Sequence, residues 1–136
     1  MTKQAEGISS GPVLTSAESQ LFVGDIGASC AFFTGKLGFA VDFLYGDPPF
    51  YAQVRRDAAL LNLRHVDHPV FDQALRECED LLSAAITVDD VELMYSEFQP
   101  AGVCFHQALR REPWGAQTFI IKDPDGNLVL FGGPAD

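Results

Sequence analysis

Two halves of the chain repeat one pattern with an offset of 65 positions. The segments Leu21–Ile26 and Ile86–Val91 are both apolar runs that contain Val-x-Asp and lead directly into a helical pattern. A repeated unit of this size indicates two copies of one supersecondary structure, because one copy cannot bury its apolar face alone. The recurring positions are Val23, Asp25, Ile26 and Phe33, which return as Val88, Asp90, Val91 and Phe98.

Each copy predicts an amphipathic helix with recognisable ends. Asp25 and Asp90 stand at the N-cap position, where a short acceptor satisfies free backbone N–H groups. Gly38 and Gly102 follow the two helices, as expected of a residue that tolerates a left-handed conformation. The apolar stripes have spacings of three and four residues, which is one face of a helix. They consist of Ile26, Cys30, Phe33 and Leu37 in the first copy and of Val91, Met94, Tyr95 and Phe98 in the second.

Three strand-like runs follow each helix. Their turns carry Asp47-Pro48-Pro49 in the first copy and Asp123-Pro124-Asp125-Gly126 in the second. Strand, helix and three strands, repeated once, predict an α+β fold of two tandem βαβββ modules that form a cupped mixed sheet with helices on its outer face. The strand-like runs are 39–45, 51–56 and 58–64, then 103–109, 117–122 and 127–132.

The pattern also predicts how the chain is divided. Residues 1–16 are rich in Gly, Ser and Thr and are expected to form a flexible or exchanged N-terminal arm. Residues 17–136 are expected to form one domain, because this length suffices for a single core. Within it, module one spans about 17–65 and module two 83–133, and the connector 66–82 contains a short helix over 71–81.

Charge and composition exclude several classes of partner. Nineteen Asp and Glu against nine Lys and Arg give a formal net charge of −10, which argues against nucleic acid and anionic membrane surfaces. No apolar run approaches the ~18 residues of a membrane span. The first 19 residues lack an apolar signal segment, and three scattered cysteines, Cys30, Cys78 and Cys104, suit reduced thiols. We therefore expect a cytoplasmic protein.

Several motifs resemble those of the vicinal oxygen chelate superfamily, which includes glyoxalase I, extradiol dioxygenases and bleomycin-resistance proteins. Ala31-Phe32-Phe33 with Leu37-Gly38-Phe39 is similar to a signature at the first helix of that superfamily. Pro113-Trp114-Gly115, followed by Asp123-Pro124-Asp125-Gly126-Asn127 and Leu130-Phe131-Gly132, resembles the bleomycin-resistance branch in particular. The resemblance covers about Val13 to Gly133 and implies the paired-module fold, but a fold alone does not fix a ligand.

The resemblance also implies where a metal would be held in the enzymes of the superfamily. Counting from the repeat landmarks, the four ligand positions fall on Glu18, Leu60, Ser83 and Leu130. Leucine offers no donor atom, and hard or borderline cations need carboxylate or imidazole ligands. We therefore expect no metal and no cofactor, and a binding protein rather than an enzyme. The alternatives are a metal-dependent lyase or dioxygenase with shifted ligands and a metal-free isomerase with Glu18 as base.

Strand alternation predicts which side chains line the cup. The expected cavity is apolar with a few polar groups, suited to a small-molecule ligand. Trp114 is the only tryptophan and is expected to stack on a ring or a cation. Relatives of the bleomycin-resistance type imply a homodimer with ligand crevices between subunits and exchange of an N-terminal strand, here Val13–Ser16. The predicted ligand-binding residues are Trp114, Phe22, Glu18, Gln20, Leu60, Ser83, Thr87 and Leu130, with Ala85 and Leu128 facing the same cavity.

Other candidate groups have simpler interpretations. His65, Asp67 and His68 follow a strand and are expected to form a solvated loop. His106 lies in a predicted strand, and no Asp or Glu stands at a spacing that would predict a contact with it. Arg110-Arg111-Glu112 is expected to be an exposed charge cluster. The sequence thus predicts that an acidic protein with an aromatic slot captures a small-molecule ligand, and a cationic planar antibiotic is a candidate for that ligand. Phe43, Tyr51 and Phe119 are further aromatic candidates, each expected in the core.

Overall fold

The computed structural model describes residues 11–135 and confirms two βαβββ modules in that range. Each module runs strand, helix, three strands, and the modules are joined by a connector with one short helix, α2 (Gln73–Cys78). Module one contains β1 (Ser19–Val23), α1 (Ile26–Gly35), β2 (Ala40–Gly46), β3 (Pro49–Arg56) and β4 (Ala59–His65). Module two contains β5 (Ala84–Thr87), α3 (Val91–Phe98), β6 (Cys104–Arg111), β7 (Ala116–Lys122) and β8 (Leu128–Pro134).

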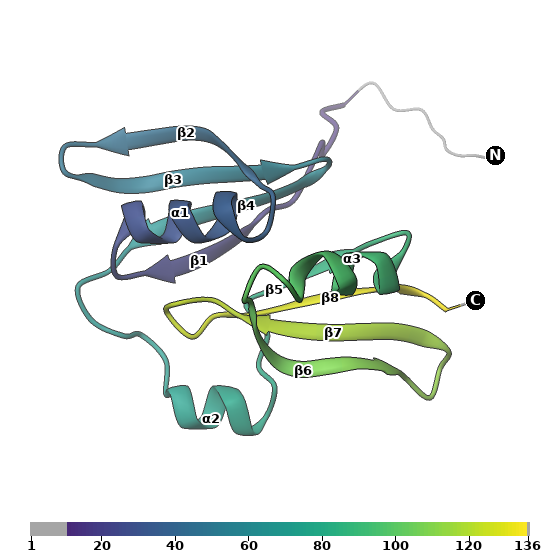
Figure 1. Cartoon of the computed structure of the whole chain (residues 1–136). Coiled ribbons are helices and arrows are strands. Elements are labelled where there is room, and N and C mark those ends of the chain that lie inside the picture. The colour runs from purple at the N-terminus through teal and green to yellow at the C-terminus, as the bar shows by residue number, and fades with distance from the viewer. Residues whose placement is uncertain (1–10, 136) are drawn as a thin grey trace.

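The strands form two four-stranded mixed sheets rather than one hydrogen-bonded sheet (Figure 1). Sheet A has the order β1-β4-β3-β2, and sheet B has the matching order β5-β8-β7-β6. In each sheet the first and last strands of the module pair in parallel and the other neighbours pair antiparallel. β1 and β5 contact each other, so the two sheets lie side by side with these edges at the centre.

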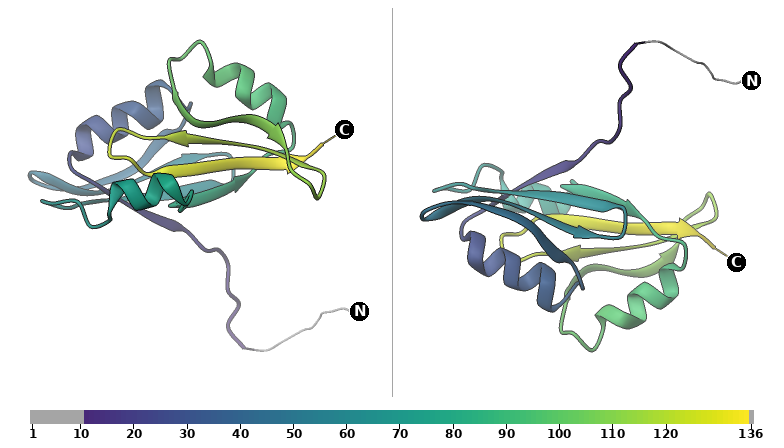
Figure 2. Two further views of the ribbon diagram at one scale, coloured as in Figure 1. Left: turned by 90° about the horizontal axis from the view of Figure 1, so that it is seen from below. Right: turned by 90° about the horizontal axis from the view of Figure 1, so that it is seen from above.

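The core lies on the side of the sheets that is covered by α1 and α3 (Figure 2). α1 packs on β2, β3 and β4, and α3 packs on β7 and β8. Leu21 and Val23 from β1 point into this core, as strand alternation predicts, and Phe33 and Phe98 from the two helices are fully buried. Phe119 is also fully buried, in contact with several other aromatic rings, which confirms its assignment to the core.

The helix ends follow the sequence pattern closely. Asp25 Oδ1 accepts a hydrogen bond from the Ala28 backbone N–H at 3.0 Å, and Asp90 Oδ1 accepts one from Leu93 at the same distance. These N-caps satisfy backbone donors that have no partner inside the helix. Gly38 has φ 75°, so the turn that sends the chain from α1 into β2 uses a conformation that glycine adopts without strain.

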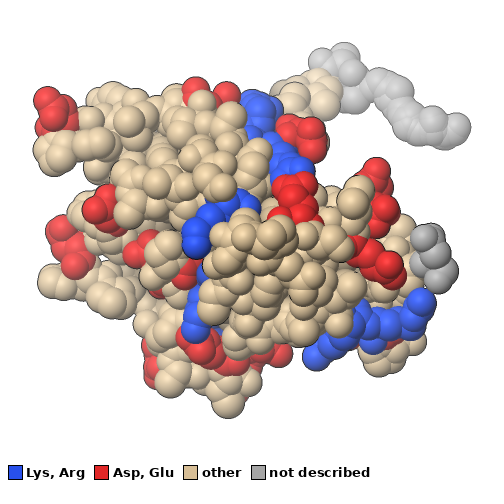
Figure 3. All heavy atoms as spheres, in the orientation of Figure 1, with Lys and Arg blue, Asp and Glu red and all other residues tan. Residues whose placement is uncertain are grey.

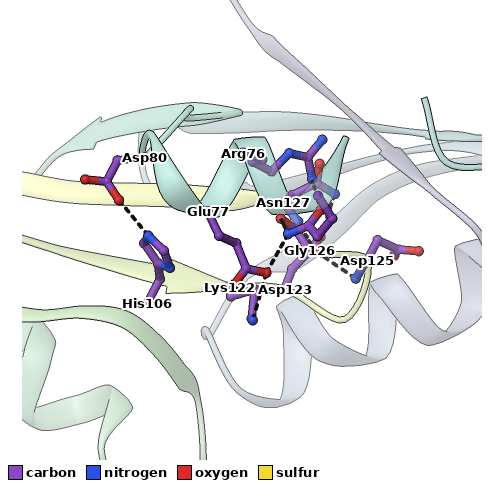
Figure 4. Close-up of polar contacts among 10 residues, drawn as sticks. Arg76, Glu77, Asp80, His106, Lys122, Asp123, Asp125, Gly126 and Asn127 are labelled. Atoms are coloured by element: carbon purple, nitrogen blue, oxygen red, sulfur yellow. Dashed lines mark hydrogen bonds and ion pairs between the residues drawn. The ribbon is translucent and has the colours of Figure 1, made fainter. Parts of the chain in front are cut away.

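α2 and the turn after it lie on the face of sheet B opposite α3, where one ion pair and one hydrogen bond hold them (Figures 2 and 4). Lys122 Nζ on β7 lies 3.1 Å from Glu77 Oε2, and His106 Nε2 on β6 lies 2.7 Å from Asp80 Oδ1. The helix is shorter than the predicted 71–81, since the chain leaves helical geometry after Cys78 and Asp80 adopts a positive φ of 52°. The contact between His106 and Asp80 could not be predicted from sequence, because the two residues are 26 positions apart along the chain.

An extended arm and the outer hairpin of sheet A expose apolar surface. Val13 and Leu14 lie in a segment that runs away from the body, with exposed fractions of 74% and 100% (Figure 2). All seven residues of β2 are exposed, and much of the surface over this hairpin is uncharged in Figure 3. Residues 1–10 of the predicted arm lie outside the described range. The exposed apolar side chains of the hairpin are Val41, Phe43, Leu44, Tyr45 and Phe50.

Candidate ligand-binding site

The face of sheet A away from α1 carries a connected group of amide and carboxylate side chains. Gln53 is 9% exposed, and its Nε2 donates to Asn62 Oδ1 at 2.8 Å and to Glu18 Oε1 at 3.3 Å. Asn62 Nδ2 donates to the same Glu18 oxygen at 3.2 Å. Glu18 itself is exposed and lies just before β1. This face therefore presents polar groups whose positions are fixed before any ligand arrives.

Aromatic side chains lie beside this polar group. Tyr51 OH donates to Gln20 Oε1 at 3.1 Å, and the Tyr51 ring stacks on Phe43 with centroids 5.9 Å apart. Phe43 is 43% exposed and Tyr51 is half-buried, so neither belongs to the core as the sequence had predicted. Strand β2 is an edge strand whose outer surface is uncovered, which periodicity alone does not reveal.

The corresponding face of sheet B is partly closed. Leu130 is in register with Ala85 and Ile120, and it is half-buried. Leu128, which strand alternation assigned to the cavity side, is fully buried and lies outside the core cluster that Val129 and Phe131 join, so on that side it is covered and does not line an open cavity. It lies opposite Lys122, the residue that pairs with α2, and the connector closes this end of the face.

The cluster Arg110-Arg111-Glu112 is not wholly an exposed charge cluster. Glu112 is 8% exposed, and its Oε2 accepts hydrogen bonds from Thr118 Oγ1 at 2.6 Å and from Arg110 Nε at 3.0 Å. These two donors lower the pKa of Glu112 below its ordinary value, because they bind its charged form. The buried carboxylate thus stabilises the turn that carries Trp114.

A hollow of about 270 Å³ opens where β1 meets the connector and the start of β5. We call it the connector hollow. It brings together three of the predicted ligand-binding residues, Gln20, Phe22 and Ser83. Its other walls are Phe71, Leu75 and Arg76 from the connector, Leu81 and Leu82 before β5, Asp72 and Asn127.

A second hollow of about 260 Å³, the seam hollow, lies further along the same junction between the sheets. Leu60 and Thr87, two more predicted residues, line it together with Ala85. The structure therefore divides five of the eight predicted residues between two neighbouring hollows. Glu18 and Leu130 lie on the two flanking sheets and line neither hollow.

Trp114 lies apart from both hollows. It is 76% exposed at the tip of the β6–β7 turn, which closes with a hydrogen bond from the Glu112 N–H to the Ala116 carbonyl at 2.7 Å. Gly115 takes φ 98° in this turn, a conformation that glycine supplies. Within one copy of the chain Trp114 and the hollows do not form a single site.

Residues 14–131 match the family model of the Glyoxalase/Bleomycin resistance protein/Dioxygenase superfamily. The chain belongs to this superfamily. The match spans both modules and the connector, so the resemblance that the sequence motifs carried is confirmed over the whole domain.

Similar proteins include a resistance protein and a binding protein for bleomycin, and also a glyoxalase-related enzyme. A bleomycin resistance protein of Geobacillus stearothermophilus is 28% identical over 120 residues, which cover 80% of this chain and 89% of the relative. A second similar protein is the bleomycin-binding protein of the bleomycin-producing Streptomyces verticillus, whose crystal structure contains copper(II)-bleomycin. Its sequence is 26% identical, its TM-score is 0.70, and the alignment covers 93% of this chain and 100% of that chain. A glyoxalase-related enzyme from Clostridium phytofermentans has a TM-score of 0.72 at 15% identity, covers 93% of this chain and 100% of that one, and shows the fold alone.

The superfamily's metal positions do not fit a metal in this chain. Leu60 and Leu130 have no donor atoms, and the Ser83 hydroxyl donates to Asn127 Oδ1 at 3.1 Å. Glu18 alone retains a carboxylate. Among residues 11–135 there is no group of three or more His, Cys, Asp or Glu side chains arranged to hold a metal ion. Asp67 and His68 are exposed in the loop after β4, as predicted, whereas His65 is the half-buried last residue of that strand, and its Nε2 lies 3.0 Å from Asp67 Oδ1.

Sequence reasoning missed two residues at the connector hollow. Arg76 on α2 is 6% exposed, and Asn127 after the Asp-Pro-Asp-Gly turn is 1% exposed. The sequence placed Arg76 in a predicted connector helix. It could not show that Arg76 would be buried, because the pattern did not show which side of that helix faces the protein. Asn127 stood in the recognised motif, which was read only as a turn. No helix in the described part of the chain is long and apolar enough to cross a membrane.

Proposed function

We propose that this chain is a small-molecule-binding protein that captures its ligand by stoichiometric binding and does not transform it. The observation that carries the proposal is the pair of hollows at the junction of the two sheets, lined by Gln20, Phe22 and Ser83 and by Leu60 and Thr87. These are five of the eight predicted ligand-binding positions, and the two hollows combine apolar side chains with polar groups, as ligand pockets do.

We propose a bleomycin-type antibiotic as the ligand. The relatives named as bleomycin resistance and bleomycin-binding proteins support this choice. The net charge of −10 favours approach of a cationic molecule by long-range attraction that weakens as salt rises. Trp114 offers an exposed flat ring on which a heteroaromatic group can stack.

We propose that two copies of the chain complete the site. Trp114 is remote from the hollows of its own copy, and a second copy would bring another Trp114 to them. The exposed apolar side chains of the β2–β3 hairpin, including Phe43 and Leu44, form an uncovered patch of the kind that marks an interface. The arm residues Val13 and Leu14 extend from the body and are suited to exchange between subunits. A cytoplasmic location remains part of this proposal.

The enzyme alternatives lack the groups they need. A metal-dependent lyase or dioxygenase would require donors where Leu60 and Leu130 stand. A metal-free isomerase with Glu18 as base would require a buried carboxyl group, because desolvation is what moves a carboxyl pKa toward neutrality. Glu18 is exposed, and it accepts hydrogen bonds from the side-chain amides of Gln53 and Asn62.

The proposal is tested by titrating the purified protein with metal-free bleomycin and with its copper(II) complex. Trp114 is the only tryptophan, so its fluorescence reports on its own environment alone. We expect saturable quenching in the micromolar range or below, with heat of binding at one ligand per protomer in calorimetry. Absence of both quenching and heat with either form would rule out the antibiotic as the ligand.

A further inference from the structure

Arg76 is a mostly buried residue whose guanidinium forms no ion pair with any residue in the range 11–135. Only 6% of the residue is exposed, and the ion pairs of Arg55, Arg56, Arg110 and Lys122 do not include it. The guanidinium donates one hydrogen bond, from Nη1 to the amide oxygen of Gln73 at 3.3 Å. A guanidinium carries five N–H donors, and no Arg76 nitrogen is both fully buried and unpaired, so its other donors remain accessible. The remaining donors therefore favour an incoming acceptor.

Aromatic rings hold this guanidinium in one orientation. The Arg76 Cζ atom lies 4.6 Å from the centroid of the Phe71 ring, which is a cation–π distance. Phe71 in turn contacts Phe22 of β1, with ring centroids 6.0 Å apart. Stacking leaves the edge of the planar guanidinium available, and that edge matches a carboxylate in bidentate geometry.

Arg76 lines two hollows, a smaller one shared with Asp67 and Asp125 and the connector hollow, which has an apolar wall. Leu75, Leu81 and Leu82 line the same hollow as Arg76, and each is exposed. Gln20 and Ser83 add neutral polar groups at the opposite wall. At about 270 Å³ the hollow is below the usual size of a drug-sized site, so it fits a compact group of one or two rings.

We propose that Arg76 binds a carboxylate on a compact apolar ligand, or on an apolar arm of a larger ligand, seated in the connector hollow. This inference rests on the proposed binding function and adds an anion-recognising residue to it. The Arg76 site differs from Trp114 in the charge it favours. Trp114 can stack on a cation, whereas Arg76 favours a negatively charged group, although the protein as a whole is acidic.

The acidic side chains near Arg76 are engaged elsewhere. Asp72 lines the connector hollow, and its Oδ1 accepts the N-cap hydrogen bond from the Leu75 N–H at 3.2 Å. Asp125 Oδ1 accepts from the Gly24 N–H at 2.8 Å. Asp67 contacts His65, and Glu77 pairs with Lys122. None of them forms an ion pair with Arg76, so the guanidinium keeps its free donors.

The test compares benzoate with benzamide and benzylamine, three probes of similar size and different charge. Binding is measured by calorimetry and by NMR of the arginine Nε–Hε resonances. Benzoate is expected to bind and to shift the Arg76 resonance. Benzamide and benzylamine are expected to bind at least about tenfold more weakly than benzoate. Arg76→Met removes the donors and is expected to abolish the preference for benzoate. Arg55→Met, at an exposed arginine on sheet A, is the matched control and is expected to leave that preference unchanged.

Equal binding of benzoate and benzamide, or an unchanged preference in Arg76→Met, would overturn the inference. If Arg76→Met does not fold, Arg76→Lys and the wild-type NMR shift decide, because a lysine keeps the charge but not the bidentate fork. A bleomycin titration runs in parallel. Bleomycin binding without benzoate binding contradicts this inference and leaves the proposed function standing, and the reverse result contradicts the antibiotic alone.

Discussion

Asn127 donates a hydrogen bond from its side-chain Nδ2 to the backbone carbonyl oxygen of Phe22 at 3.0 Å, across 105 positions of the chain. The same Nδ2 donates to Asp123 Oδ2 at 2.9 Å, and Asn127 Oδ1 accepts from Ser83 Oγ at 3.1 Å. One buried amide therefore joins β1 of module one to the hairpin and to the strand start of module two. It fixes the floor of the connector hollow.

Replacing this amide is expected to loosen the junction between modules. Asn127→Ala leaves the half-buried Phe22 carbonyl, the Ser83 hydroxyl and the buried Asp123 carboxyl group without this partner, and we expect it to lower the free energy of unfolding by about 2–3 kcal/mol. Urea denaturation followed by circular dichroism measures this loss. Asn62→Ala, at a half-buried asparagine on the open face of sheet A, is the control and is expected to cost about 1 kcal/mol or less. Similar losses in the two variants would contradict the assigned role of Asn127.

Asp123 predicts a specific dependence of stability on pH. Burial raises the pKa of this carboxyl group from 3.8 to about 6, despite hydrogen bonds from Asn127 and from two backbone N–H groups. The folded state therefore holds the proton more tightly than the unfolded chain. The stability that this residue contributes is complete below pH 3.8 and is lost as the pH rises to about 6.

The variant Asp123→Asn isolates this effect from the other carboxylates, since asparagine does not titrate. We expect the unfolding free energy of the variant, relative to wild type, to rise by roughly 2–2.5 kcal/mol between pH 4 and pH 7, because each unit of pKa shift corresponds to about 1.4 kcal/mol and part of the effect falls below pH 4. Urea titrations of both proteins at several pH values give the difference. A difference that does not change with pH would show that Asp123 is ionised normally in the folded protein.

The ion pair between Arg56 and Glu97 joins the two modules and predicts the opposite dependence of stability on pH. Arg56 Nη2 donates to Glu97 Oε1 at 3.0 Å, and Arg56 Nη1 donates to the Leu37 carbonyl at 2.8 Å. The hydrogen bond from Arg56 lowers the pKa of Glu97, so its contribution to stability is present above the ordinary carboxyl pKa and is lost as the pH falls through the lowered value.

Because both side chains are partly exposed, the pair itself is worth little. We expect Glu97→Gln to lower the unfolding free energy by less than about 1 kcal/mol. Arg56→Met also deprives the Leu37 carbonyl of its donor and is expected to cost about 1–2 kcal/mol. Chemical denaturation at neutral pH measures both. A larger loss in Glu97→Gln than in Arg56→Met would contradict this order.

The repeat made most of the fold predictable. Both N-caps, both helical stripes and the order of strands could be read from the spacing of Asp25, Asp90 and the apolar residues around them, because these signals are local in sequence. The confirmed family match extends over the same elements. The sequence could not show that the strands form two sheets, because this depends on whether β1 and β5 form backbone hydrogen bonds or only contact each other.

The candidate site was only partly predictable, because long-range contacts decide it. Alternation placed Gln20, Phe22 and Ser83 on the correct side, and the structure brings them to one hollow. Alternation could not show that the connector closes over Leu128. It also gave no sign that Arg76 would be buried on α2, since a six-residue helix has too few positions to define an apolar face.

The proposed dimer predicts that the exposed apolar arm and hairpin drive association. Leu14→Asp and Phe43→Asp place a charge where a partner would cover apolar surface, and we expect each to shift the protein from dimer to monomer. Leu93→Asp, at an equally exposed leucine on α3, is the control and is expected to remain dimeric. Light scattering coupled to size-exclusion chromatography measures the mass. A monomeric wild type at micromolar concentration would rule out this part of the proposal.

Recovery of the ligand after binding tests most directly whether the protein captures a molecule without changing it. Protein treated with chelator is incubated with one equivalent of metal-free bleomycin per protomer, the affinity is measured by calorimetry, and the released ligand is analysed by mass spectrometry. We expect the affinity to be the same with and without chelator, and the ligand to return with unchanged mass. Loss of binding on chelation, or a ligand of altered mass, would contradict capture without catalysis.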